Sequence, residues 1–83
     1  MTTIRFFAGA RAAVGVAETT VSESTLGAAL DAVARRDDLA DAGRWQELAP
    51  RCSYLVDGVT TRDRATPLVG VALVDVMPPF AGG

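Results

Sequence analysis

The last six residues of the chain are the part of the sequence best suited to chemistry. They read Pro78-Pro79-Phe80-Ala81-Gly82-Gly83. Consecutive prolines hold a backbone extended, and glycines can thread a channel that is too narrow for any other residue. A terminal carboxylate is a poor acyl donor, but once adenylylated its carbonyl is open to attack by sulfur or nitrogen. The pattern therefore predicts an activated C-terminal glycine, with Gly83 as the reactive residue and Gly82 next to it.

The rest of the chain holds few side chains that could catalyse a reaction. It has no His and no Lys, its 8 basic residues are all Arg, and its single cysteine is Cys52. The usual general base and the commonest metal ligand are therefore missing, and one Cys forms neither an internal disulfide nor a Cys-based metal site. We expect no metal, no bound cofactor and no catalytic side chain. Although Arg51 precedes Cys52, we expect a half-buried, unreactive thiol.

Composition limits the class of protein further. A chain of 83 residues, 49% of them hydrophobic, forms one compact domain. The net charge of −2 argues against a nucleic-acid partner. No apolar segment approaches the roughly 20 residues that span a bilayer, and the first ten residues lack the pattern of a signal peptide. We expect no membrane association and a cytoplasmic location, which also suits an unpaired thiol.

The first half of the chain predicts a hairpin followed by a helix. Residues 3–8 and 17–22 are rich in strand formers, and a turn or short helical stretch over 9–16 joins them. Alternation places Arg5 and Phe7 on the solvent face of the first strand, so Phe7 is either a scattered surface aromatic or a docking residue. Thr25 is a suitable N-cap for an amphipathic helix. Its apolar positions are Leu26, Ala29, Leu30 and Val33.

The second half predicts a polar loop and two strands. Residues 37–51 form the loop, in which Trp45 covers the core; its three Asp residues lack the Gly and Glu spacing of a calcium loop. Residues 52–57 form a strand that turns at Asp57-Gly58. Residues 68–77 contain the central strand, after a bend at Gly70.

The order of these elements predicts an α+β fold of the β-grasp kind. The first and last strands can pair in parallel at the centre of a mixed sheet, with one main helix packed across one face. Prolines 78 and 79 end the last strand because neither can donate to a ladder. We therefore divide the chain into a β-grasp domain over 1–77 and an extended C-terminal Gly-Gly tail over 78–83.

Three features together resemble a known family. They are the order of elements, the opening Ile4-Arg5-Phe6-Phe7-Ala8 with Arg11 following, and the ending Pro-Pro-Phe-Ala-Gly-Gly. Across essentially the whole chain these look like the small subunit of molybdopterin synthase, the MoaD-type sulfur carrier. The Pro-Pro-x-x-Gly-Gly ending is the most specific part. The stretch 51–55 looks like that of actinobacterial members. A composition without Lys and Asn but rich in Ala, Gly, Arg and Val indicates coding from a GC-rich genome, which agrees with this.

The resemblance implies a ubiquitin-like fold and a role as a sulfurtransferase subunit. An E1-like enzyme would use ATP to adenylylate Gly83, and sulfur would then be installed as a thiocarboxylate. The tail would enter the large subunit, which holds the catalytic groups, and sulfur would pass to cyclic pyranopterin monophosphate in molybdenum cofactor biosynthesis. Two small and two large subunits would form a heterotetramer. The partner-binding residues implied are Phe7, Arg11, Met77, Pro78, Pro79, Phe80 and Ala81, with Phe80 at the mouth of the tunnel.

The chain also departs from the family pattern. Members usually have Gly-Asp-Glu before the last strand, where this chain has Gly70-Val71-Ala72, which puts part of the contact with the activating enzyme in question. The usual Asn in the turn after the third strand is Asp57. Two alternatives stay open: a β-grasp sulfur carrier for thiamine or cysteine synthesis, and a ubiquitin-like protein modifier.

Overall fold

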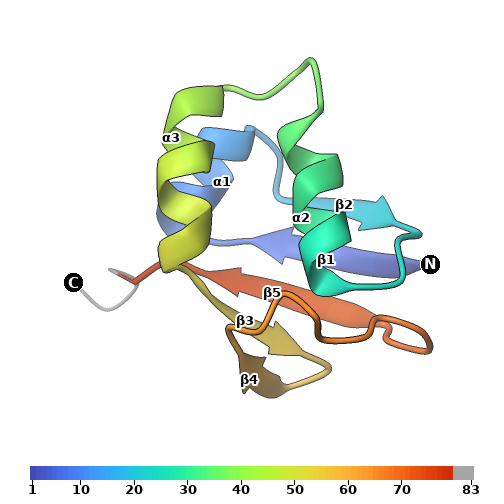
Figure 1. Cartoon of the computed structure of the whole chain (residues 1–83). Coiled ribbons are helices and arrows are strands. Elements are labelled where there is room, and N and C mark those ends of the chain that lie inside the picture. Colours follow the sequence, from blue (N-terminus) through green and yellow to red (C-terminus); the bar gives the residue numbers. More distant parts are fainter. Residues whose placement is uncertain (80–83) are drawn as a thin grey trace.

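The computed structural model describes residues 1–79, which form a mixed five-stranded sheet covered on one face by helices (Figure 1). The strands are β1 (Thr2–Phe6), β2 (Glu18–Val21), β3 (Ser53–Val56), β4 (Val59–Thr61) and β5 (Leu73–Met77). The helices are α1 (Ala8–Val14), α2 (Leu26–Ala34) and α3 (Ala42–Leu48), followed by the 3-10 turn η1 (Ala49–Arg51). The predicted α+β class is confirmed.

The strand order is β2-β1-β5-β3-β4, with β1 and β5 parallel and the other neighbours antiparallel. The predicted parallel pairing of the first and last strands at the centre is therefore confirmed. Its inward side chains alternate as the sequence indicated: Ile4, Phe6, Val74 and Val76 are all buried against the helices. Each such side chain contributes about 1.5–3 kcal/mol by leaving water.

The predicted amphipathic helix is present as α2. The Thr25 hydroxyl accepts a hydrogen bond from the amide of Ala28 at 3.2 Å, which satisfies one of the unpaired amides of the first turn. The four periodic apolar side chains face the sheet and are buried.

The prediction of a loop over 37–51 is wrong for its second half. Asp41 caps α3 by accepting from the amide of Arg44 at 3.0 Å, and Trp45 and Leu48 turn into the core three residues apart. One main helix was expected, but the structure has three helices among the described residues. α3 packs against α1, and these two helices lie beside α2. A helix of seven residues with two buried positions is too short to show a clear period.

Strand boundaries also differ from the prediction. β1 ends at Phe6 because Ala8 adopts a left-handed conformation (φ +50°) that turns the chain into α1. β5 begins at Leu73, after the bend at Gly70 (φ +79°). The turn at Asp57-Gly58 has two positive φ angles, as a tight hairpin requires, and leads into the short strand β4, which was not predicted.

Trp45 is expected to be a main source of stability. Its side chain is 1% exposed and meets the ring of Phe6 edge to face, with centroids 5.8 Å apart. Trp45→Ala should lower the free energy of unfolding by about 3–5 kcal/mol, measured by urea denaturation followed by circular dichroism. Gln46→Ala, an exposed neighbour on α3, should change it by less than about 0.5 kcal/mol. Equal stability of the two variants would contradict this role of Trp45.

Candidate functional site

The helix-free face of the sheet carries an ion pair at its centre. Arg5 on β1 and Asp75 on β5 are opposite each other in the parallel register. Arg5 Nε donates to Asp75 Oδ1 at 2.7 Å and Nη2 donates to Oδ2 at 2.9 Å, so the contact is bidentate. The side chain of Asp75 is 15% exposed and that of Arg5 is 44% exposed. The pair therefore lies on the surface, where solvent weakens it, but its geometry is fixed.

The ion pair also orders an aromatic ring. The hydrogen bonds that Arg5 donates to Asp75 are the main cause that raises the pKa of Arg5. The guanidinium carbon lies 5.7 Å from the ring centroid of Phe7, within the range of a cation–π contact. Asp75, Arg5 and Phe7 thus form one connected group, which we call the open-face triad.

Phe7 is held at the junction of β1 and α1. Its backbone is extended (φ −122°, ψ 151°), and its carbonyl accepts from the amides of Ala10 and Arg11, which begin α1. The side chain is 37% exposed, as expected for the solvent face. Arg11, also exposed, lies one turn further along α1. The docking role predicted for both residues stays a prediction.

The end of β5 brings the remaining predicted residues to the same edge of the sheet. Since Phe6 is opposite Val76 in the parallel pair, Phe7 and Met77 leave the sheet at the same end. Met77 pairs with Ser53 on its other side and is half-buried. Of the two prolines that follow, Pro78 is buried and Pro79 is exposed. The other predicted tail residues, Phe80, Ala81, Gly82 and Gly83, lie outside the described residues.

Sequence reasoning missed the open-face triad as a unit. Alternation already placed Arg5 on the solvent face of the first strand, and the first and last strands were expected to be parallel neighbours. What it lacked was the register, because sliding β1 by two residues would keep every face and break the ion pair.

The surroundings of Cys52 do not favour a reactive thiolate. It is fully rather than half buried, and its Sγ contacts the carbonyl of Leu48 at 3.4 Å. Burial raises the pKa of the thiol, and this outweighs the hydrogen bond with Tyr54 and the charge of Arg62, which lower it. The cation whose charge lowers the pKa of the thiol is Arg62, from the segment after β4. The expectation of an unreactive thiol is supported.

The reactivity of Cys52 provides a direct check on its burial. Alkylation by iodoacetamide at pH 8 should be much slower in the native protein than in urea, because the native thiol is both shielded and less ionised. Following the adduct by mass spectrometry measures both rates. Equal rates in the two conditions would mean that the thiol is accessible in the folded protein.

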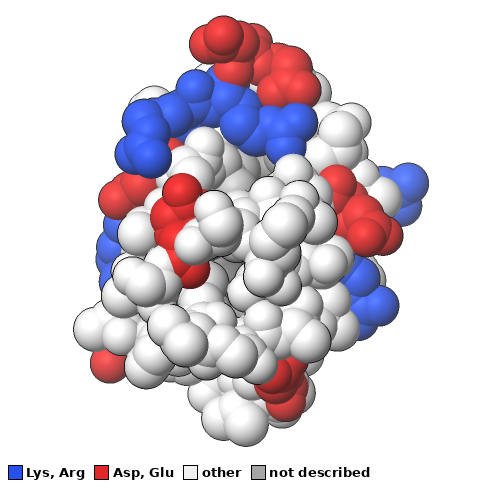
Figure 2. All heavy atoms as spheres, turned by 90° about the vertical axis from the view of Figure 1, so that its right-hand side faces the viewer, with Lys and Arg blue, Asp and Glu red and all other residues white. Residues whose placement is uncertain are grey.

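The face of the molecule next to the N-terminus differs in charge from the helix-free face of the sheet. Figure 2 shows it largely uncharged across its centre, with acidic and basic side chains around the edge. A hollow there is lined by Met1 and Val69, both exposed, and by Val71 and Ala72. The Val71 carbonyl accepts from the Thr2 hydroxyl at 2.8 Å, so this segment also fastens the start of β1. Val71 and Ala72 thus have a structural role, since their carbonyls accept hydrogen bonds from Thr2 and Thr3 at the start of β1.

Among residues 1–79, no helix is long and apolar enough to cross a membrane. The same residues contain no group of three or more Cys, Asp or Glu side chains placed to hold a metal ion. Two of the clustered aspartates have other partners: Asp41 caps α3, and Asp38 pairs with Arg36, which lowers the pKa of its carboxyl.

No protein-family model and no curated protein matches the chain.

Proposed function

We propose that this chain is a β-grasp sulfur carrier, the small subunit of a molybdopterin synthase, and that Gly83 is its reactive residue. The observation that carries the proposal is the position of β5. It is the central strand, paired on both sides, and Pro78-Pro79 follow it directly. A short segment that must reach into a partner needs a rigid base, and the centre of the sheet supplies one.

The described topology supports a β-grasp fold. A β-grasp sheet has two hairpins flanking a parallel central pair, with a helix laid across one face. The order β2-β1-β5-β3-β4 and the place of α2 agree with this arrangement (Figure 1). α1 and α3 are additions to it, and they cover the part of the sheet that α2 leaves open.

In the proposed reaction the chain contributes a main-chain carboxyl and no side-chain base. An E1-like enzyme transfers the adenylyl group of ATP to the Gly83 carboxylate and releases pyrophosphate. Sulfur at the oxidation level of sulfide, supplied by a donor, then attacks the acyl adenylate, displaces AMP and leaves a thiocarboxylate. In the active site of the large subunit this sulfur passes to cyclic pyranopterin monophosphate, and water cleaves its bond to the Gly83 carbonyl and regenerates the carboxylate. Two such transfers supply the dithiolene. The chain has no Lys, so it offers no side-chain amine that could capture its own activated terminus.

The proposed surface for the large subunit is the edge where Phe7 and Met77 leave the sheet. It combines an exposed aromatic ring with the apolar end of β5, and aromatic anchors of this kind dominate many interfaces. The ion pair with Asp75 fixes Arg5 beneath the ring of Phe7, so less side-chain entropy is lost on binding. Arg11, one turn along α1, can add a polar contact at the rim.

Phe7→Asp should weaken association with the large subunit by more than tenfold, because a carboxylate would have to be desolvated in the contact. Isothermal titration calorimetry with the isolated large subunit measures this. Val59→Ala is the control and should leave the affinity unchanged, because Val59 is exposed on the edge strand β4 and lies opposite Val56, at the other end of the sheet. An unchanged affinity for Phe7→Asp would remove Phe7 from the interface.

Removal of Gly83 tests the function itself. A chain that ends at Gly82 should fold with the same thermal midpoint as the full chain, because residues 1–79 contain the sheet and its core. It should give no sulfur transfer in a single-turnover assay with the large subunit, the activating enzyme, ATP and a sulfur donor. Turnover equal to that of the full chain would exclude the proposed role of Gly83. If the full chain instead forms an adduct with a lysine of another protein, it is a modifier.

A further inference from the structure

A pocket of about 360 Å³ lies on the helix side of the sheet, between α2, α3 and β3. The buried side chains of its lining are Leu30, Trp45, Cys52 and Tyr54, and we call these the base of the pocket. The pocket is thus apolar at its base, and its size is at the lower end of the range for small-molecule sites. None of the residues of the open-face triad lines it.

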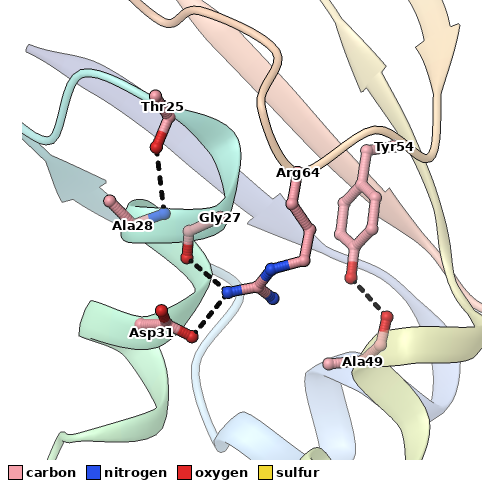
Figure 3. A network of polar contacts seen from close by, with 7 residues as sticks. All are labelled: Thr25, Gly27, Ala28, Asp31, Ala49, Tyr54 and Arg64. Carbon is pink, nitrogen blue, oxygen red and sulfur yellow. Dashed lines mark hydrogen bonds and ion pairs between the residues drawn. The ribbon is translucent and has the colours of Figure 1, made fainter.

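Two arginines from the segment after β4 form the rim of the pocket. Arg64 is fixed by Nη2, which donates to Asp31 Oδ1 at 2.7 Å and to the carbonyl of Gly27 at 3.1 Å. Figure 3 shows its guanidinium lying between α2 and the ring of Tyr54. Gly27 makes this possible, because a Cβ there would lie 3.0 Å from Cβ and 3.1 Å from Nε of Arg64. Arg62 Nη2 donates to the carbonyl of Arg51 at 3.4 Å.

The charged residues that line the pocket do not balance one another. Among the described residues that line the pocket, Arg62 and Arg64 are cationic and Asp31 is anionic, so this lining carries a net charge of one positive unit. A guanidinium has five N–H donors, and the bonds of Arg64 within the described part of the chain all start from Nη2. The positive charges of Arg62 and Arg64 also act on the buried hydroxyl of Tyr54. Both charges lower its pKa, although burial raises this pKa overall. The hydroxyl of Tyr54 is already held by the Ala49 carbonyl at 2.6 Å.

We propose that this pocket binds a small organic anion that carries an aromatic ring. The carboxylate of such a ligand would lie between Arg62 and Arg64, and its ring would cover Leu30 and the edge of Trp45. A bidentate carboxylate–guanidinium contact is the strongest polar contact this rim can offer. The apolar base favours a ring over a bare inorganic ion, and the volume limits the ligand to one or two rings. The site is independent of the proposed sulfur chemistry.

Titration of the ¹⁵N-labelled full chain with 2-naphthoate, followed by NMR, tests the proposal. Trp45 is the only tryptophan, so the single indole N–H signal reports directly on the base of the pocket. We expect a saturable shift of this signal and of the amide of Ala34, which also lines the pocket. Arg62→Gln should raise the Kd about tenfold, since it removes a charged contact but leaves the bonds of Arg64 to α2 intact.

The controls separate charge from ring and site from surface. Arg35→Gln removes an exposed arginine that does not line the pocket, and it should leave the Kd unchanged. The neutral analogue 2-naphthalenemethanol and inorganic phosphate alone should each bind at least tenfold more weakly than 2-naphthoate. The proposal is overturned if the indole signal does not shift, if either control ligand binds as tightly, or if Arg62→Gln and Arg35→Gln have equal effects.

Discussion

The pairing of β1 with β5 is the constraint on which the rest of the structure depends. It joins residues about 70 positions apart, with Thr3 opposite Leu73 and Phe6 opposite Val76. Both strands have other strands on their far sides, so an error in this register would displace the whole sheet. The pairing also decides where the chain leaves the sheet, because parallel strands end at the same edge. The topology of the sheet therefore places Phe7 and Met77 at the same end of it.

The two faces of that central pair have separate properties. Toward the helices, the strands bury apolar side chains beneath α2 and the α1–α3 pair, and the pocket with its arginine rim lies above β3 on this side. Away from the helices, the same strands present the bidentate pair of Arg5 and Asp75, which holds the ring of Phe7. A change on one face can thus be tested without disturbing the other, because successive residues of a strand point to opposite sides.

Much of the fold could be predicted because its main elements follow regular periods. A run of strand-forming residues revealed β1, a long apolar run revealed β5, and the spacing of the apolar side chains over 26–33 revealed α2. α3 could not be recognised from two buried positions, although Asp41 was a usable capping signal. The open-face triad and the contact of Arg64 with Gly27 depend on strand register and on a loop crossing a helix. Sequence spacing contains neither, because both are set by tertiary packing.

Under the proposed function a partner supplies the catalytic groups, and this chain supplies a carboxyl that follows a rigid central strand. Intact-mass spectrometry of the chain, after incubation with an E1-like activating enzyme, ATP and a sulfur donor, tests this most directly. The result predicted is the mass increase that replaces one oxygen by sulfur, located by fragmentation at Gly83 and dependent on ATP. An unchanged mass, or a sulfur atom located on Cys52, would contradict it.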